Sequence, residues 1–250
     1  MKRGGIERAA LPTADSESGN FSAAKASPYY RAADELKLFT QIVDGRCLQI
    51  TVGRGVISID KNHLKEKIMN KLEEKTLTSK SIYDGRIIKY YLDTVELPDG
   101  NTAEREIVRH PGGVCIAALD NDNNLFFVRQ FRYPYKEITL ELPAGKLEKG
   151  STPLENGKRE LLEETGCEGY SFISLGQLYP STGYTDEIIH LYACRVKSEG
   201  EQQPDFDEFI NTEKIHIDKA LEMILNNQIP DAKTQVTVLK LSELLRLGNI

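Results

Sequence analysis

Three glutamates stand close together in the chain, at Glu160, Glu163 and Glu164. In a helix, residues three and four apart share a face, so these carboxylates would lie side by side. Like charges at this spacing repel each other by roughly a few tenths of a kcal/mol per pair. Two arrangements relieve the repulsion: a solvated helix face, or a hard divalent cation such as Mg²⁺, which takes carboxylate and phosphate oxygens as ligands.

The residues on either side of the glutamates predict the helix that carries them. Thr152 suits the N-cap, Pro153 suits the first helical position, and Glu155 completes a Thr-x-x-Glu capping box. Gly166 suits the left-handed position that ends a helix. The apolar side chains expected on the opposite face are those of Leu154, Leu161 and Leu162.

The segment before this helix favours the cation over the solvated face. A Pro-Ala-Gly turn comes first, and a loop runs from Gly145 to Gly150 into the helix. With the helix, this segment resembles the Nudix box, G-x5-E-x7-R-E-U-x-E-E-x-G-U, in which U is aliphatic. Two positions depart from the pattern, Ser151 at the first glutamate and Cys167 at the last aliphatic residue. The matching positions are Gly145, Arg159, Glu160, Leu161, Glu163, Glu164 and Gly166.

The resemblance extends from about residue 77 to residue 245, where the chain is similar to the ADP-ribose pyrophosphatases among the Nudix hydrolases. The segments that carry it include VRQFRYPYKEITLELPAGKLEKG, SLGQLYPSTGYTDEIIHLYACR and EMILNNQIPDAKTQVTVL. Ser181-Thr182-Gly183 stands where the subfamily usually has Ser-Pro-Gly. The resemblance implies an α+β fold, an α/β/α Nudix sandwich with a mixed sheet, preceded by an N-terminal antiparallel β element. We expect an N-terminal extension at residues 1–75 and a Nudix hydrolase domain at residues 76–250.

A metal site follows from the resemblance. Glu160 and Glu164 would hold Mg²⁺, or Mn²⁺ in its place, with the backbone carbonyl of Ala144 as a further ligand. Glu163 would lie beside them and bind a second ion. Arg159 would pair with a carboxylate of the box and hold the loop in place.

The resemblance also implies substrate-binding residues. Arg132 and Arg105 match positions that contact substrate, and a planar guanidinium can donate two hydrogen bonds to a diphosphate. A surface salt bridge is the alternative for each arginine. Glu141, on an otherwise apolar strand, either faces the pocket or faces solvent on an alternating strand. Ser181 is counted with the substrate-binding residues.

The general base is expected on an acidic loop beyond the box. In EQQPDFDEF the candidates are Asp205, Asp207 and Glu208, of which we favour Glu208. Glu187, in Thr-Asp-Glu, is the second choice. The alternative for residues 205–208 is a solvated loop without a catalytic role.

The rest of the chain narrows the class of protein. A net charge of −6 argues against a nonspecific binder of nucleic acid. Four cysteines without CxxC pairing argue against a zinc site or a disulfide scaffold, and they fit a reducing compartment. No apolar run approaches the ~20 residues that a membrane span needs, and the N-terminus is a poor signal peptide. We therefore expect a cytoplasmic protein. The four histidines, His63, His110, His190 and His216, show no metal-ligand spacing.

Local patterns predict the remaining elements. Residues 1–30 read as disordered, residues 48–59 as strands around a Gly-Arg-Gly turn, and residues 62–75 as an amphipathic helix. Beyond the box we expect strands in SFISLGQLYP, EIIHLYACRV and residues 209–217. Two helices follow, at residues 217–225 with Asp218 as cap and at residues 234–247.

These observations lead to one expected activity and two alternatives. The expected activity is Mg²⁺-dependent hydrolysis of the diphosphate bond of ADP-ribose to AMP and ribose 5-phosphate. The first alternative is a pyrophosphatase for another nucleoside-diphosphate sugar, such as GDP-mannose. The second is a Nudix-fold module that binds such ligands without cleaving them. The resemblance further implies a homodimer whose N-terminal sheets exchange and complete each other's sites.

Overall fold

A computed structural model describes residues 39–43, 47–52, 55–60 and 72–248, except residues 205 and 207. The chain divides into two compact units, Met1–Leu72 and Glu73–Ile250. The disorder expected for residues 1–30 and most of the helix expected at residues 62–75 lie outside the described residues. The domain boundary at residues 75 and 76 stays a prediction, because compactness alone does not establish independent folding.

The described part of the first unit is an antiparallel sheet. Its strands β1 (Phe39–Val43), β2 (Cys47–Val52) and β3 (Gly55–Asp60) pair in that order. In the register of β2 and β3, Val52 lies opposite Gly55. The strands predicted at residues 48–59 are therefore confirmed.

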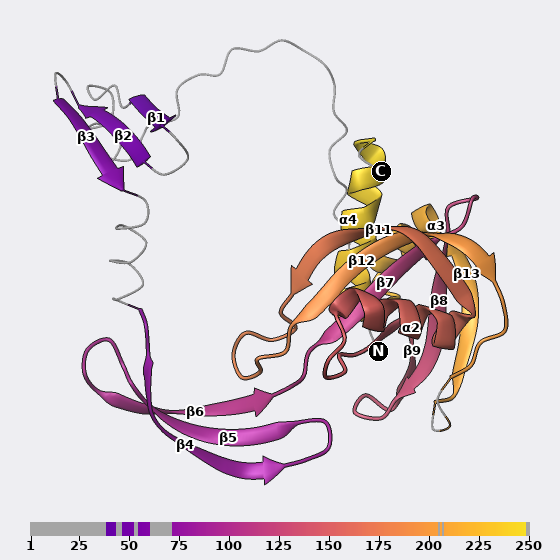
Figure 1. The fold of residues 1–250 in the computed structure, drawn as a ribbon, viewed down its shortest axis with the longest axis horizontal. Coiled ribbons are helices and arrows are strands. Elements are labelled where there is room, and N and C mark those ends of the chain that lie inside the picture. The colour runs from indigo at the N-terminus through magenta and orange to yellow at the C-terminus, as the bar shows by residue number, and fades with distance from the viewer. Residues whose placement is uncertain are drawn as a thin grey trace, which may run out of the picture. The chain divides into compact units, whose positions relative to one another are not determined.

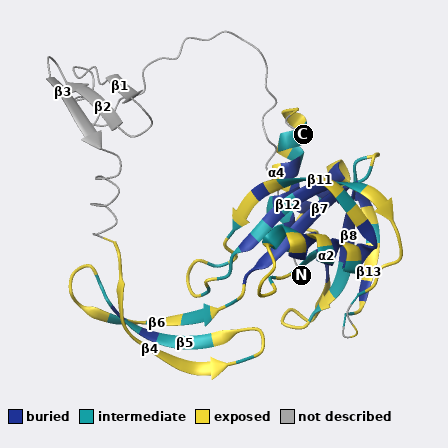
Figure 2. Cartoon of the chain, in the orientation of Figure 1, coloured by how far each residue is buried: buried dark blue, intermediate teal, exposed yellow. Residues whose placement is uncertain are grey.

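A second antiparallel sheet begins the other unit. It contains β4 (Lys75–Asp84), β5 (Lys89–Glu96) and β6 (Thr102–Arg109), paired in chain order. The turn sequences Tyr-Asp-Gly and Pro-Asp-Gly-Asn separate these strands, as expected from their glycines. All of β4 is exposed, as its yellow ribbon shows in Figure 2.

The central sheet is mixed. Its main path runs β11-β12-β7-β8-β13, with β10 added to β7 and β9 added to β8. Strand β12 is parallel to β7, whereas the other recorded pairings are antiparallel. The strands are β7 (Gly113–Leu119), β8 (Asn124–Arg132), β9 (Glu137–Glu141), β10 (Ala144–Lys146), β11 (Cys167–Leu178), β12 (Ile189–Glu199) and β13 (Ile210–His216).

Helices cover the two faces of this sheet (Figure 1). Helix α2 (Pro153–Thr165) packs on one face, while α3 (Ile217–Leu225) and α4 (Ala232–Arg246) pack on the other. The expected α/β/α sandwich is confirmed. Among the described helices, none has the length and apolar character needed to cross a membrane.

Strand β7 shows why the sheet needs a helix on each face. All seven of its residues are buried, and successive side chains of a strand point to opposite faces. Cys115, Ala117 and Leu119 join the core under α3 and α4. Val114, Ile116 and Ala118 join the core under α2, together with Leu161. A strand apolar on both faces is stable only between two layers.

Local capping sets both ends of α2. Thr152 is the N-cap, both halves of its capping box with Glu155 are formed, and Gly166 ends the helix at φ 72°. The predicted sides of the helix are partly wrong, because Leu162 is 46% exposed whereas Glu160 and Glu164 are buried. The cap predicted for α3 is also wrong: His216 occupies that position and accepts a hydrogen bond from the Asp218 backbone N–H.

Candidate active site

A cavity with a volume of about 930 Å³ opens beside the glutamate face of α2. Its walls come from β8, β10, α2 and the first turn of α4, and from the segments before β7, β12 and β13. Of the predicted site residues, those that line it are Arg132, Ala144, Glu160, Glu164, Glu187 and Glu208.

One wall of the cavity is acidic and largely dehydrated. Glu160 is 8% exposed and Glu164 is 3% exposed. Burial, together with the neighbouring charge of Glu160, raises the pKa of Glu164 to about 8. Burial also raises the pKa of Glu160, although Arg159 opposes the rise. The two carboxylates are therefore difficult to ionise together at neutral pH. An additional positive charge beside them would make it easier for both to ionise.

Strand β10 brings the backbone against these carboxylates, and the turn predicted at Pro-Ala-Gly is therefore wrong for Ala144 and Gly145. The Ala144 N–H donates to Glu164 Oε2 at 3.0 Å. A Cβ atom added to Gly145 would lie 1.8 Å from Glu160 Oε1, so only glycine fits at this position. The spacing of the box thus reflects a contact between a short strand and a helix face.

Arg159 and Asn156 fasten the loop to the helix. Arg159 donates to Glu160 at 2.6 Å and to Glu163 at 2.5 Å, and its Nη2 lies 3.5 Å from Glu148 Oε1. Asn156, which is 1% exposed, accepts from the Glu148 N–H at 3.0 Å. These bonds brace the loop in a chain that has Ser151 where the family has glutamate. Glu163 is held by Arg159 and does not line the cavity.

Cationic side chains also line the cavity. Arg132 lines the cavity and forms a two-bond pair with Glu141, at 2.6 Å from Nε and 2.7 Å from Nη2. Glu141 is 3% exposed and lies behind Arg132. Its carboxylate therefore faces inward, which excludes the solvent-facing alternative. Direct contact between Glu141 and substrate stays a prediction.

The two candidate bases lie at different places in the cavity. Glu208 comes from the segment before β13 and is near enough to Glu160 and Glu164 to raise the pKa of both. Glu187 precedes β12, and its Oε1 lies 3.3 Å from His110 Nδ1. Asp205 and Asp207 lie outside the described residues.

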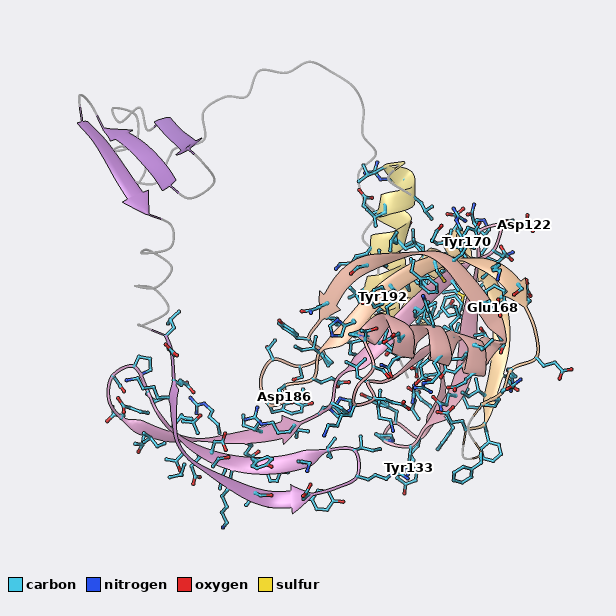
Figure 3. The ribbon with its side chains drawn as sticks, viewed as in Figure 1. Asp122, Tyr133, Glu168, Tyr170, Asp186 and Tyr192 are labelled. Carbon is cyan, nitrogen blue, oxygen red and sulfur yellow. The ribbon has the colours of Figure 1, made fainter. Side chains whose placement is uncertain are left out.

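The segment that carries Glu187 is fastened to the end of β6. The Val108 N–H donates to the Tyr184 carbonyl at 2.7 Å, and Asp186 accepts from the His110 N–H at 2.9 Å. Asp186 also pairs with Arg109 at 3.0 Å, and Figure 3 labels it at this junction. The three-stranded sheet β4–β6 is thereby connected directly to one wall of the cavity.

Besides Glu163 and Glu141, the predicted residues Arg105 and Ser181 do not line this cavity. Arg105 lies on β6 and pairs with Glu74, at 2.8 Å from Nε and 2.5 Å from Nη2. Ser181 lies on the loop between β11 and β12 and is half-buried. Their substrate-binding roles stay predictions.

Sequence reasoning missed several residues that line the cavity, namely Arg86, His110, Asp231 and Lys233. His110 had no partner at short sequence spacing, because Glu187 lies 77 positions away. Asp231 and Lys233 stand in a segment that resembles the family, but nothing local connects them to Glu141.

The donor set fits a hard divalent cation. Glu160 and Glu164 offer carboxylate oxygens at one site and lack enough positive charge around them, and both properties suit Mg²⁺. No group of three or more His, Cys, Asp or Glu side chains in the described residues is arranged as a metal site. The predicted set includes a backbone carbonyl and only two carboxylates, so it does not depend on such a group.

The raised pKa of Glu164 predicts a pH-dependent stability in the metal-free protein. Because the folded state keeps this proton up to about pH 8 and the unfolded state loses it near 4.5, the stability from this group falls as pH rises through that window. Glu164→Gln should flatten the fall in melting temperature between pH 5 and pH 8, and Mg²⁺ should raise the melting temperature only in the unmutated chain. Each kcal/mol corresponds to about 2–4 °C at this size. Glu168→Gln, at an exposed carboxylate, is the control. Equal pH slopes for Glu164→Gln and the unmutated chain would contradict the assignment.

Comparisons with known proteins agree with this geometry. The model of the NUDIX domain matches residues 109–235, and that of the nucleoside diphosphate sugar hydrolase N-terminal domain matches residues 74–108. A methanol dehydrogenase activator of Bacillus methanolicus is 44% identical over 71% of this chain and 99% of its own length. An ADP-ribose pyrophosphatase of Bacillus subtilis is 38% identical over 71% of this chain and 98% of its own length. A GDP-mannose pyrophosphatase of Yersinia enterocolitica is 30% identical over 60% of this chain and 83% of its own length. The chain therefore belongs to the Nudix family, as a hydrolase of nucleoside-diphosphate sugars.

Proposed function

We propose that this enzyme hydrolyses ADP-ribose to AMP and ribose 5-phosphate and that it requires Mg²⁺. The observation that carries the proposal is that acidic and cationic side chains line the same cavity. Glu160 and Glu164 form an acidic wall, and Arg132 with Lys233 forms a cationic one. A diphosphate with a bound cation matches both. The volume of about 930 Å³ is within the range of sites that enclose small ligands.

The reaction is a displacement at phosphorus. The oxygen of a water molecule forms a new P–O bond, the bridging P–O bond breaks, and a base accepts the proton of the water. When bound, Mg²⁺ would neutralise phosphate charge and lower the pKa of a coordinated water. Glu160, Glu164 and the Ala144 carbonyl are the proposed ligands, with Glu163 as the proposed neighbour of a second ion. Arg132 would orient the diphosphate through its free guanidinium edge.

We infer that Glu208 is the general base. Its charge already acts on the two carboxylates proposed as ligands, which supports a position beside the reacting phosphorus. Glu187 is the alternative, but its carboxylate lies against His110. A base must come within hydrogen-bond reach of the water that it deprotonates.

ADP-ribose is favoured over other nucleoside-diphosphate sugars by the names of the relatives. A pyrophosphatase named for ADP-ribose is similar over nearly its whole length, whereas one named for GDP-mannose matches less of both chains. Arg132, Glu160 and Glu164 would contact features that all these substrates share, so the base and the sugar must be set by other contacts.

The first measurement is phosphate release from ADP-ribose, with a phosphatase acting on the two products. We expect turnover with Mg²⁺, none with EDTA, and a loss of about 100-fold or more in Glu164→Gln. Glu168→Gln should keep full activity. Faster turnover of GDP-mannose than of ADP-ribose would overturn the substrate proposal. Metal-independent turnover would overturn the assigned site, and binding without any turnover would favour the non-catalytic module.

Substitution of the two candidate bases distinguishes them. Glu208→Gln should lower kcat by about 10²–10⁴-fold, because general-base catalysis contributes that much. Glu187→Gln should act mainly on KM. The reverse ranking would assign the base to Glu187.

We further propose that the enzyme is a homodimer in which β4–β6 of one copy completes the site of the other. Arg105 does not line the cavity of its own chain, although it matches a substrate-binding position of the subfamily. The sheet also exposes apolar side chains to solvent, which is typical of a surface that another chain covers. These are Leu77, Ile82 and Tyr83 on β4, and Ile88 in the turn before β5.

Mixing two inactive variants tests the shared site. After Arg105→Ala and Glu164→Gln subunits are unfolded and refolded together, half of the dimers should be mixed, and each mixed dimer should hold one intact site. Activity should then return to about a quarter of the unmutated level, as two-fold symmetry requires. Light scattering checks the oligomeric state. A monomer, or a mixture as inactive as its components, would contradict the proposal.

A further inference from the structure

The first turn of α4 places a buried lysine at the base of the cationic wall. Lys233 Nζ donates a hydrogen bond to Glu141 Oε2 and lies 3.0 Å from Asp231 Oδ2. Its side chain is only 13% exposed, yet the residue lines the cavity. Burying an ammonium is costly unless it is paired, and two carboxylates pair with this one.

Glu141 is the centre of this group. Its carboxylate accepts two bonds from Arg132, one from Thr139 Oγ1 at 2.6 Å and one from Lys233. A carboxylate has about four lone-pair positions, so these donors fill it. Glu141 therefore serves as a fixed acceptor between two cations.

The arrangement leaves Arg132 with one edge for a ligand. Its Nε and Nη2 are used by Glu141, whereas within the described part of the chain no hydrogen bond from Nη1 is recorded. The side chain is 37% exposed, compared with 13% for Lys233. Both cations line the cavity, and Arg132 is the more exposed of the two.

We propose that Lys233 is a positioning residue that holds Glu141, and through it fixes the Arg132 guanidinium toward the diphosphate of the substrate. The inference depends on the proposed function in one respect, which is that Arg132 contacts the diphosphate of the substrate. Lys233 acts without touching the substrate, by fixing the carboxylate on which Arg132 is oriented.

The backbone around Lys233 is rigid enough for this role. Asp231 caps α4 by accepting from the Thr234 N–H at 3.0 Å. Thr234 Oγ1 in turn accepts from the Leu142 N–H at 2.9 Å, next to Glu141. Thr237 Oγ1 donates to the Lys233 carbonyl at 2.6 Å. Helix α4 is thereby capped at its start and fastened, through Thr234, to the segment directly after β9.

Electrostatics supports the same arrangement. Burial alone would raise the pKa of Glu141, but the hydrogen bonds from Arg132 and the charge of Lys233 hold it at about 2. Burial alone would lower the pKa of Lys233, but Asp231 and Glu141 raise it. Arg132, Glu141 and Lys233 are therefore charged at neutral pH.

A double-mutant cycle tests the proposal. We expect Lys233→Met to raise KM about tenfold with kcat within about threefold, because binding through Arg132 is weakened and the reacting groups are untouched. We expect Arg132→Gln to raise KM by at least as much. In the double variant the two losses should not add, since Lys233 acts only through Arg132. Additive losses would show that Lys233 contacts the substrate directly and would overturn the positioning role.

Two controls separate this role from a loss of folding. Lys240→Met removes a lysine on the same helix that bonds the Leu175 carbonyl outside the cavity, and it should leave KM unchanged. Melting temperatures of all variants show whether stability explains the effects. A melting temperature that falls in Lys233→Met without any change in KM would make Lys233 a structural residue and overturn the proposal.

A binding measurement keeps this test independent of the substrate. ADP carries the diphosphate without the second sugar, and calorimetry with Mg²⁺ gives its Kd for each member of the cycle. If the unmutated enzyme does not hydrolyse ADP-ribose, the proposed function is wrong. Non-additive losses of affinity for ADP would still support the role of Lys233. Equal Kd values for the unmutated chain and Lys233→Met would overturn that role even where ADP-ribose is the substrate.

Discussion

The repulsion between two buried carboxylates is the constraint around which this structure is built. Glu160 and Glu164 lie one turn apart on α2, and both are nearly excluded from water. A helix would normally turn such a face to solvent. Here the capped ends of α2, the core contacts of Leu161 and the close approach of Gly145 in β10 hold that face against the sheet. The stability of the sandwich maintains a site that is unfavourable without a cation.

How far the sequence predicts this arrangement depends on how local the interactions are. The limits of α2 follow from Thr152, Glu155 and Gly166, because capping acts over three or four residues. The same pattern misplaced Leu162, since it assumes that apolar residues face inward, whereas at this site the cavity takes the charged face. The pairs of Lys233 with Glu141 and of His110 with Glu187 span 92 and 77 positions. Such pairs exist only after the sheet has formed, and no local pattern encodes them.

Ser151 departs from the family pattern, and other residues of this chain fix the loop to the helix. In the family pattern a glutamate at this position ties the loop to the helix. In this chain Ser151 is exposed, and its backbone N–H donates to the Glu148 carbonyl at 3.3 Å. Glu148 instead reaches Arg159, while buried Asn156 binds both the Glu148 N–H and the Thr152 carbonyl. The loop is therefore fixed from its other end, and the two carboxylates keep their positions.

The two walls of the cavity differ in how their charge is balanced, and this difference has a chemical consequence. On the acidic wall, burial leaves Glu164 with a pKa of about 8, so its charge becomes favourable only when a cation arrives. On the other wall, Arg132 and Lys233 are already balanced by Glu141 and Asp231. Because its charges are balanced, that wall attracts an anion only weakly at long range. It does present the Arg132 guanidinium in one fixed orientation. Its contribution is therefore geometric, and under the proposed Mg²⁺ site the attraction for a diphosphate would come from the acidic wall once it holds metal.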